Sequence, residues 1–527
     1  MIDQISSIVA DIAAIPNRLT NHIGMYRLVT ISLVTIFFCS IVASLFDLIA
    51  YSVAAQLVSV SIALVTALTI NIALAKVLNI HANHESAIIT ALILYFMMIP
   101  YVGIMANWAL ISATVLGIVS KYLITYRRQH IFNAAAFGAV ALVVLIGGYN
   151  FVTGNTHNTD IFSWWVSNPV LFWPVLILGI LIISKIRRVA MVGSFIGVGL
   201  LVFLFESWRL ELPIWDSTIL YFVSFPTLFL AFFMLTEPFT MPPKQSHQIM
   251  YGGLVGALSS TAIFAPFFPM TPELALVLGN AFAYTFRIRR KLFLKLQSKR
   301  LIAENTWEFV FSKPEGFSFE AGQYVEWMLP HEKKDSRGTR RYFTIASSPT
   351  ESVVRLALKV MPSAGSTYKQ ALMKMDEGEE LIVSQLAGDF VLPKDIDTKL
   401  GFIAGGIGVT PFSSHLAWMK DSGKQYDTHL YCCANTTAEL AYHDRFKAMS
   451  DALPLEIIPT IAKDEVEGPM EKGYVTTEIL TRRTPDYKKR TWYISGPPGM
   501  VNAYKKLLKE SGVPTKQIHT DFFPGLA

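Results

Sequence analysis

The run Arg341-Tyr342-Phe343-Thr344-Ile345-Ala346-Ser347-Ser348 decides the fold of the second half of this 527-residue chain. It lies among short segments in which apolar and polar residues alternate, the pattern of half-buried strands. These segments are FLKLQSKRLIA (293–303), WEFVFSK (307–313), QYVEWMLP (323–330), RRYFTIASS (340–348), VVRLALKVM (353–361) and EELIVSQLAG (379–388). Short strands at even spacing favour a small antiparallel β-barrel, which we predict over residues 292–397.

Beyond residue 397 the pattern changes to apolar strands separated by helical segments. The strands are LGFIAGG (400–406), THLYCCAN (428–435), LEIIPTI (455–461) and TWYISGPP (491–498). Strands that alternate with helices in this way form doubly wound parallel sheets. We therefore predict an α/β doubly wound nucleotide-binding domain over 398–527.

The first half of the chain has a different composition. The whole chain is 52% hydrophobic and only 16% charged, whereas a soluble domain carries about 25% charged residues. Before residue 290, apolar runs recur between short polar loops, and a helix needs about 20 apolar residues to span a bilayer. We predict a polytopic α-helical membrane domain over 1–291 with ten spans, at 28–49, 54–75, 86–100, 105–124, 133–150, 168–184, 189–205, 217–236, 249–267 and 272–287.

The cationic residues predict how these spans are oriented, because the inner loops of membrane proteins are enriched in Lys and Arg. With the N-terminus in the cytoplasm, the inner segments hold Arg18, Arg27, Lys76, Lys121, Arg127, Arg128, Lys185, Arg187, Arg188, Lys244, Arg287, Arg289, Arg290 and Lys291, and the outer loops hold only Arg209. Ten spans return the chain to the cytoplasm, where the nucleotide pool is. We expect an integral protein of the inner or plasma membrane with both termini cytoplasmic. Its partner is the lipid bilayer, and no nucleic acid is expected.

The run at Arg341 resembles the R-x-[YF]-[ST] motif of the ferredoxin–NADP reductase superfamily. The resemblance implies FAD as cofactor, with Arg341 on the pyrophosphate through charged hydrogen bonds. It also implies that Phe343 stacks on the flavin beside Tyr342 and that the Thr344 hydroxyl bonds flavin N5. Lys359-Val360 and Gly365-Ser366-Thr367 fit the family's second FAD segment, in which amides and a hydroxyl at a helix N-terminus receive phosphate.

Two further motifs resemble the nicotinamide-dinucleotide site of that superfamily. The first, Ile403-Ala404-Gly405-Gly406-Ile407-Gly408-Val409-Thr410-Pro411-Phe412, follows a strand and opens a helix, so its backbone can approach a dinucleotide and its helix N-terminus favours phosphate. Its expected binding residues are Gly405, Gly406, Gly408, Val409, Thr410 and Pro411. The second, Ser495-Gly496-Pro497-Pro498-Gly499-Met500, matches C-G-P-P-x-M with Ser495 in place of the Cys near nicotinamide C4. The residues it implies for NAD(P) binding are Ser495, Gly496, Pro497, Pro498 and Met500.

The segment His519-Thr520-Asp521-Phe522-Phe523 resembles the family's closing acid-plus-aromatic segment. The resemblance implies that Asp521 lies near Ser495 and that Phe523 covers the flavin until nicotinamide displaces it. A plain terminal strand is the alternative. The expected catalytic residues are Thr344, Ser495 and Asp521.

The choice between NADH and NADPH depends on the residues after the strand that ends at Cys432-Cys433-Ala434. NADPH enzymes often place Arg or Lys there to meet the 2′-phosphate. Here Asn435-Thr436-Thr437 occupy that position, which favours NADH with Asn435 as a binding residue. Arg445 and Lys447 come shortly afterwards and leave NADPH open.

Three motifs in the membrane half resemble two related membrane proteins, RnfD of the Rnf complex and NqrB of the sodium-translocating NADH:quinone reductase. They are NHESAIITALIL (83–94), QHIFNAAAFG (129–138) and FFMLTEPFTMPP (232–243), with Ala134 for the family's Pro, Glu237 for Asp and Ala91 for Gly. The resemblance implies a ten-helix fold that holds a flavin, FMN or riboflavin, and an ion path. Glu85, Asn133 and Glu237 are the candidate site residues, because each acid lies beside a short or proline-broken segment.

Those two proteins also carry FMN on a Thr of an outer loop, in a motif like D-x-x-[ST]-G-A-T. Asn150-Phe151-Val152-Thr153-Gly154-Asn155-Thr156 occupies the corresponding loop. Thr156 is therefore the candidate FMN attachment residue. A polar extracytoplasmic loop without flavin is the alternative.

Other cofactors are not expected. Cys39, Cys432 and Cys433 form no C-x-x-C motif and no Cys/His cluster, so we predict no metal and no iron–sulfur site. Stacked haems need paired histidines inside helices, and the histidines of this half lie in loops or at helix ends, so we predict no haem.

These patterns predict an NAD(P)H-dependent flavin oxidoreductase fused to a membrane domain. It would take hydride from NAD(P)H onto FAD and pass electrons into or across the membrane through a membrane-domain flavin. The acceptor would be quinone or an extracytoplasmic flavoprotein. A redox-driven Na⁺ or H⁺ transporter is the alternative, because acidic groups lie within or beside the spans.

Overall fold

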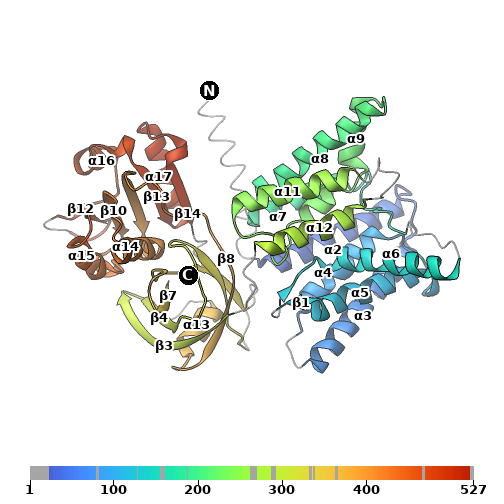
Figure 1. The fold of residues 1–527 in the computed structure, drawn as a ribbon, viewed down its shortest axis with the longest axis horizontal. Coiled ribbons are helices and arrows are strands. Elements are labelled where there is room, and N and C mark those ends of the chain that lie inside the picture. Colours follow the sequence, from blue (N-terminus) through green and yellow to red (C-terminus); the bar gives the residue numbers. More distant parts are fainter. Residues whose placement is uncertain are drawn as a thin grey trace. The chain divides into compact units, whose positions relative to one another are not determined.

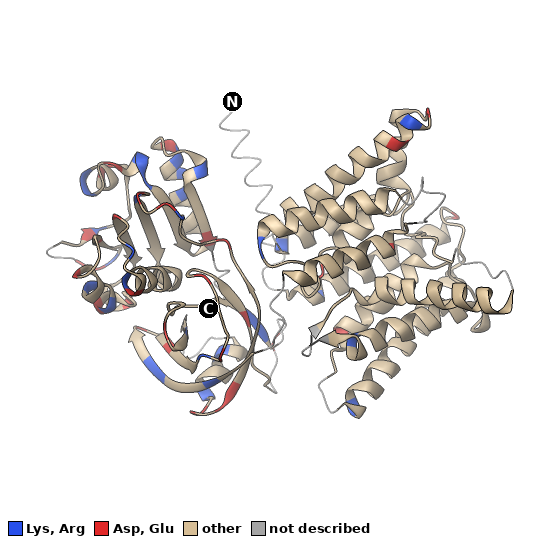
Figure 2. Ribbon diagram, in the orientation of Figure 1, with Lys and Arg blue, Asp and Glu red and all other residues tan. Residues whose placement is uncertain are grey.

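The computed structural model describes residues 23–78, 82–126, 129–154, 161–186, 188–261, 270–286, 292–331, 335, 339–361, 366–465 and 469–522. The chain divides into two compact units, Met1–Arg290 and Lys291–Ala527, called unit 1 and unit 2 below. Figure 2 shows charged residues spread over the elements of unit 2, whereas the helices of unit 1 carry few. This contrast is the one expected between a part that meets lipid and a part that meets water.

The described part of unit 1 consists of helices and one short hairpin (Figure 1). The helices are α2 (Met25–Leu45), α3 (Val53–Val77), α4 (His84–Met97), η1 (Met105–Asn107), α5 (Trp108–Leu123), α6 (Ala134–Thr153), α7 (Phe172–Ile186), α8 (Val189–Arg209), α9 (Ile214–Val223), α10 (Thr227–Phe229), the π-helical turn η2 (Leu230–Met234), α11 (Gln245–Ser260) and α12 (Pro272–Thr285). The hairpin joins β1 (Thr125–Tyr126) to β2 (Gln129–His130). Each predicted span overlaps one of these helices or the run from α9 to η2.

Fewer helices than predicted have the length and apolarity that a span needs. Among the described residues five do: α2, α3, the run Met105–Leu123, α6 and α8. A sixth is added if Ile214–Val223 and Thr227–Met234, which meet at 46°, form one bent span. The expectation of ten spans is therefore confirmed only as far as five or six apolar helices. The described helix α4 has 14 residues, or about 21 Å at 1.5 Å per residue, against about 30 Å of hydrocarbon.

The helices of unit 1 pack through glycines at close backbone contacts. A Cβ on Gly252 or Gly256 of α11 would lie 2.2 Å from the carbonyl oxygen of Met191 or Phe195 on α8. A Cβ on Gly138 of α6 would lie 2.3 Å from Ala113 O on α5. Small residues that let helix backbones touch are typical of association inside membranes, where apolar side chains gain nothing by leaving lipid.

The first half of unit 2 is an antiparallel sheet of six strands, as the alternating segments predicted. The strands are β3 (Leu292–Ala303), β4 (Thr306–Ser312), β5 (Tyr324–Met328), β6 (Arg340–Thr344), β7 (Val353–Lys359) and β8 (Glu380–Ala387), in the order β6-β5-β8-β3-β4-β7. Helix α13 (Thr367–Lys374) lies between β7 and β8 in sequence. The core of this antiparallel sheet buries Phe309, Trp327 and Leu356, because alternate residues of each strand point inward.

The second half of unit 2 is the predicted α/β sheet. Its strands are β9 (Leu400–Gly405), β10 (Thr428–Ala434), β11 (Leu455–Ile461), β12 (Glu471–Lys472), β13 (Thr491–Gly496) and β14 (Ile518–Phe522), all parallel, in the order β12-β11-β10-β9-β13-β14. The main helices are α14 (Thr410–Ser422), α15 (His443–Ser450), α16 (Thr477–Arg483) and α17 (Pro498–Glu510). The strand order reverses between β9 and β13, and open sheets bind ligands beyond the carboxyl ends of strands at such a switch point.

A fully buried carboxylate joins the two sheets of unit 2. Glu308 on β4 accepts hydrogen bonds from Arg300 (2.6 Å), Arg355 (3.0 Å) and the Tyr442 hydroxyl (2.7 Å). Arg445 of α15 reaches back to Glu351, with Nη2 2.8 Å from Oε1. We call Arg300, Glu308, Glu351, Arg355, Tyr442 and Arg445 the Glu308 clamp. A buried charge needs such partners, because removing one leaves the charge desolvated and uncompensated.

Replacing Tyr442 by Phe removes the clamp's hydroxyl donor and leaves the ring. Because a hydrogen bond to a buried charge contributes about 1.5–3 kcal/mol, we expect Tyr442→Phe to lower the free energy of unfolding of unit 2 by that amount. The measurement is urea-dependent labelling of the thiols of buried Cys432 and half-buried Cys433 in the detergent-solubilised chain. Tyr474→Phe, at a 70% exposed side chain, is the matched control. Equal stability of both variants would contradict the role given to the clamp.

Candidate functional site

The predicted glycine loop forms a tight turn at the carboxyl end of β9. It runs through the 3₁₀ turn η3 (Gly406–Val409) into α14, and Gly406 has φ 51°, which favours glycine. A Cβ on Gly408 would lie 2.3 Å from Ser495 O, and one on Gly405 would lie 2.2 Å from Met500 Sδ. The structure thus brings the two predicted nicotinamide-dinucleotide motifs together, and at Gly408, where the contact is with backbone, only glycine fits.

Ser495 lies at the centre of this junction. It is fully buried near the end of β13 and is paired in register with Ala404 on β9 and Asp521 on β14. Its hydroxyl oxygen has no hydrogen-bond partner among the described residues. Asp521 therefore neighbours Ser495 along the sheet edge, where the resemblance implied an acid. Phe523 lies outside the described residues.

A second polar cluster surrounds Arg341 on β6. Arg341 Nη2 lies 2.8 Å from Asp335 Oδ1 and 3.3 Å from Ser366 Oγ, and its guanidinium lies over the Tyr368 ring, 5.3 Å from the centroid. Ser366 is the residue before α13, and Thr367 begins that helix. Arg341 and Ser366 thus meet at a helix N-terminus, where an anion is favoured. Gly365 lies outside the described residues.

The remaining residues of the Arg341 run differ in exposure. Thr344 is 2% exposed, and its hydroxyl oxygen has no hydrogen-bond partner among the residues described. The Phe343 ring is 6.0 Å from that of Tyr368. Tyr342 is 46% exposed, and its hydroxyl donates to Gln385 Oε1 at 2.5 Å. The alternation of β6 therefore separates Tyr342 from the Arg341 and Phe343 side chains.

These residues fit FAD and a nicotinamide dinucleotide. A buried hydroxyl without a partner costs free energy, so the hydroxyls of Thr344 and Ser495 are in place to bond a ligand. Arg341 with Ser366 supplies a cation and a hydroxyl at a helix N-terminus, the donors that a pyrophosphate needs. The turn at Gly405–Gly408 leaves no room for side chains against Ser495 and Met500, which opens the backbone to a dinucleotide.

Lys359, predicted to bind FAD, and Asn435, predicted to bind the nicotinamide dinucleotide, both contact the carboxylate of Glu439. Lys359 Nζ lies 2.9 Å from Glu439 Oε1, while the backbone N–H and side-chain amide of Asn435 donate to Glu439 Oε2 at 3.1 and 3.2 Å. The neighbouring Val360 donates its backbone N–H to Asn305 O at 2.7 Å. The structure thus directs the Lys359 ammonium to Glu439.

Sequence patterns missed two buried polar side chains beside the site, of which one, Ser414, bonds to the Arg341 run. Both lie on α14: Ser414 donates to Ser347 O at 2.6 Å, and His415 Nε2 lies 3.0 Å from Phe390 O. A Cβ on Gly322, which has φ 88°, would lie 2.3 Å from His415 Nε2. Nothing in the local pattern around His415 distinguishes it from a surface histidine, because its neighbours come from distant segments.

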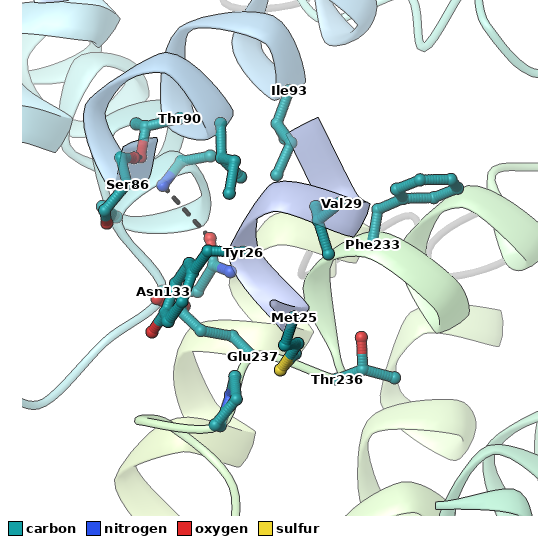
Figure 3. Close-up of a pocket in the computed structure, with 14 residues that line it drawn as sticks. Met25, Tyr26, Val29, Ser86, Thr90, Ile93, Asn133, Phe233, Thr236 and Glu237 are labelled. Carbon is teal, nitrogen blue, oxygen red and sulfur yellow. Dashed lines mark hydrogen bonds between the residues drawn. The ribbon is translucent and has the colours of Figure 1, made fainter. Parts of the chain in front are cut away.

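The membrane-half candidates are only partly brought together. Asn133 and Glu237 line one pocket with Met25, Tyr26, Ser86 and Thr90, among others (Figure 3). Asn133 caps α6, accepting hydrogen bonds from Ala135 N and Ala136 N, and Glu237 Oε1 is 3.2 Å from His130 Nε2. Glu85 is exposed on the first turn of α4, and Thr156 lies outside the described residues.

Lys121, interpreted from sequence as a topology signal, belongs to the surroundings of this pocket. Its ammonium donates to Ser86 O (2.7 Å), Ser86 Oγ (2.8 Å) and Thr90 Oγ1 (2.7 Å). A buried lysine was indistinguishable in sequence from one that faces water at a helix end. Among the described residues, no group of three or more His, Cys, Asp or Glu could hold a metal ion.

Comparisons with known proteins concern unit 2. The family model for the oxidoreductase NAD-binding domain matches residues 402–506. The glycine betaine monooxygenase reductase subunit of Chromohalobacter salexigens is 26% identical over 232 residues, 42% of this chain and 62% of that protein. The propane 2-monooxygenase reductase component of Rhodococcus jostii is 28% identical over 221 residues, 40% and 57% of the two chains. The phenol hydroxylase P5 protein of Acinetobacter pittii is 30% identical over 213 residues, 39% and 58%.

Among solved structures, the Amycolatopsis cytochrome P450 reductase GcoB is 23% identical, covers 45% of this chain and 71% of its own, and has a TM-score of 0.40. The chain spans 57% to 62% of the length of the three curated relatives named above. Unit 2 is a ferredoxin–NADP reductase-like module with an NAD-binding domain. The prediction that it is of the NAD(P)H-dependent flavin oxidoreductase type is confirmed.

His415 makes the stability of unit 2 depend on pH. Burial lowers the pKa of His415 to about 4 from its ordinary 6.5, so the folded protein keeps the ring neutral while the unfolded chain takes up a proton below pH 6.5. Stability is therefore lost as pH falls from 6.5 towards 4, by about 2 kcal/mol at pH 5 relative to neutral pH.

We expect His415→Gln to flatten the pH dependence of the free energy of unfolding of unit 2 between pH 7 and 5, measured by thiol labelling in urea. His443→Gln is the control. A residual slope is expected from His429 and His519, because burial also lowers the pKa of both. An unchanged slope in His415→Gln would show that this ring does not carry the effect.

Proposed function

We propose that this protein is a membrane-bound flavin oxidoreductase that oxidises NAD(P)H at unit 2 and delivers electrons into or across the membrane. The observation that carries the proposal is the junction of the Gly405–Gly408 turn with Ser495 at the sheet's switch point. The match of residues 402–506 to the oxidoreductase NAD-binding domain supports it. Unit 2 resembles reductase components whose names pair them with oxygenases, which supports electron transfer onward to a partner.

On this proposal Arg341, Ser366 and Thr367 hold the FAD pyrophosphate, with Gly365, Lys359 and Val360 in the same segment. Phe343 stacks on the ring, Phe523 covers the opposite side, and Thr344 bonds the ring edge, while Tyr342 belongs to the same segment with its side chain directed away from Phe343. FAD, when bound, supplies the ring that accepts hydride and releases electrons singly. The protein positions the groups that contact the ring. Thr344 is 2% exposed on β6, which pairs with β5, so its side chain loses little conformational entropy when FAD binds.

The dinucleotide would lie along the carboxyl ends of β9, β13 and β10. Gly405, Gly406, Gly408, Val409, Thr410 and Pro411 would meet its phosphates, Asn435 its adenosine end, and Ser495, Gly496, Pro497, Pro498 and Met500 its nicotinamide end. The hydroxyl of Ser495 is the polar group nearest this end, and Asp521 neighbours it in register. Together they would orient the nicotinamide and exclude water.

Unit 1 would anchor the protein in the inner or plasma membrane. One pocket is lined by Met25, Ser86, Asn133 and Glu237. In a chain of ten alternating spans, the starts of α2, α4 and α6 and the end of η2 lie on the same side of the membrane. The shared pocket therefore supports ten alternating spans. Contacts at the opposite helix ends agree. Ser59 on α3 bonds Tyr101 O at 3.0 Å, and Trp164 Nε1 bonds Glu273 on the first turn of α12 at 2.9 Å. Together with the cations of the inner loops, these contacts support a cytoplasmic position for both termini.

The resemblance to RnfD and to NqrB of the sodium-translocating reductase extends the proposal. It assigns FMN or riboflavin to unit 1, FMN attachment to Thr156, and quinone or an extracytoplasmic flavoprotein as acceptor. The domains would be 1–291, 292–397 and 398–527. Fusion of the two units would replace diffusion between separate proteins with a high effective concentration.

A redox-driven Na⁺ or H⁺ transporter is the second candidate. The contact of Glu237 with His130, near the half-buried Lys121, favours it, because ionisable groups inside a membrane are costly and mark ion paths. Turnover in proteoliposomes that depends on Na⁺, or that moves protons, would establish this function. Turnover that neither depends on Na⁺ nor moves protons would exclude the transporter function and leave oxidoreductase activity as the only candidate.

The Arg341 role is tested by flavin content. Because a charged hydrogen bond contributes about 1.5–3 kcal/mol, Arg341→Ala should weaken FAD binding by about 10- to 100-fold, measured by flavin retained in the purified full-length chain. Arg340→Ala is the matched control, since Arg340 faces Glu326 at 3.6 Å. Equal loss of FAD in both variants would contradict the assignment, and a chain that never binds FAD would end the proposal.

The membrane step is tested by a second flavin. We expect the intact mass of the chain co-expressed with a flavin transferase to include FMN, and Thr156→Val but not Thr153→Val to remove it. Stopped-flow spectra after NADH addition should show reduction of FAD before any change in the second flavin. Purified protein with one flavin would contradict transfer through a flavin in unit 1.

A further inference from the structure

We infer that the dinucleotide site of unit 2 selects NADH, because the carboxylates of Glu439 and Asp464 occupy the turn after β10 and repel a 2′-phosphate. This inference rests on the proposed function and deepens it by naming the donor. The turn concerned is Asn435–Glu439, called the β10 turn below. It matters because β10 lies beside β9 in the sheet, so a dinucleotide whose phosphates lie at the end of β9 extends its adenosine ribose towards the end of β10.

Two backbone amides of the β10 turn, those of Asn435 and Thr437, are already bonded to carboxylates. The backbone N–H of Asn435 donates to Glu439 Oε2 at 3.1 Å. The backbone N–H and the hydroxyl of Thr437 donate to Asp464 Oδ2 at 2.8 and 3.1 Å. A 2′-phosphate would therefore have to displace carboxylates from these donors and lie against two negative charges.

The carboxylate of Glu439 is fixed by Lys359, at the end of strand β7 in the antiparallel sheet. Burial disfavours the charged form, but the hydrogen bonds from Lys359 and Asn435 outweigh it and lower the pKa of Glu439. The Lys359 ammonium, 2.9 Å from Glu439 Oε1, is engaged there. Glu439 is therefore a fixed anion at neutral pH, fastened to both sheets of unit 2.

The arginine nearest in sequence is engaged elsewhere. Arg445 on α15 bonds Glu351, in the loop before β7, at 2.8 Å and lies 4.0 Å from Glu308 on β4. Arg445 belongs to the Glu308 clamp and would leave a buried carboxylate behind if it turned to a nucleotide. Lys463 remains, exposed beside Asp464, with its backbone N–H bonded to Asn435 O at 2.9 Å.

The test compares two nucleotide fragments that differ only in the 2′-phosphate. Calorimetry on the detergent-solubilised full-length chain gives the dissociation constants of AMP and of adenosine 2′,5′-bisphosphate. We expect the wild type to bind AMP at least about tenfold more tightly, because the added phosphate meets two carboxylates at short range. Glu439→Gln with Asp464→Asn keeps the acceptor oxygens but removes both charges, and should reduce this ratio to about threefold or less.

The control variant is Asp444→Asn, which removes an exposed carboxylate from the first turn of α15 and should leave the ratio unchanged. Raising ionic strength should narrow the wild-type ratio, as expected of a charge effect. Lys463→Ala should not lower affinity for the bisphosphate. Asp464→Asn alone, which should give a partial change, keeps the test interpretable if the double variant folds poorly.

Two outcomes would overturn the inference while leaving the proposed function intact. One is a wild type that binds the bisphosphate as tightly as AMP and uses NADPH at least as efficiently as NADH. The other is a double variant with the wild-type ratio. A chain that is reduced by neither NADH nor NADPH would instead end the proposed function itself.

Discussion

The contact between the glycine turn and the end of β13 is the constraint on which the site of unit 2 depends. A Cβ on Gly408 would lie only 2.3 Å from Ser495 O, so only glycine at this position lets the turn approach β13 this closely. This close approach puts the start of α14 and the buried hydroxyl of Ser495 at one edge of the sheet. Because β9 and β13 are neighbours only through a change of strand order, the site arises from topology as much as from residue type.

The two sheets of unit 2 hold the two halves of this site, and their registration depends on buried polar bonds. Glu308 accepts hydrogen bonds from two arginines of its own sheet, and from the hydroxyl of Tyr442, which belongs to the α/β half of unit 2. Ser414 and His415 on α14 add bonds to Ser347 and Phe390. Such bonds are directional and costly to leave unmade, so they specify one docking geometry where apolar packing would tolerate several. Hydride transfer needs that precision, since reacting atoms must approach to about 3–3.5 Å.

Unit 1 combines close helix packing with a polar end. Gly252 and Gly256 let α11 touch α8, while Asn133, Glu237, His130 and Lys121 gather where several helices begin or end. The π-helical turn η2 ends at Met234, two residues before Thr236, and such turns often accompany functional sites. Polar groups at a break in a membrane helix are the arrangement that transport and redox sites in membranes share.

Local pattern was sufficient for both sheets of unit 2 and for the approximate positions of the helices of unit 1, because alternation, apolar runs and glycine turns act over a few residues. It also predicted a site at Arg341, Thr344, Ser495 and the glycine loop, from residue type and order. It did not reveal the Glu308 clamp, the engagement of Lys359 and Arg445, or the role of His415 and Lys121. Those depend on partners from tens to more than a hundred residues away, and a charged residue looks the same in sequence whether it meets water, a ligand or a buried counter-charge. Five or six of the described helices have the length and apolarity of a full span, against ten predicted, since apolar character alone does not say where a helix ends.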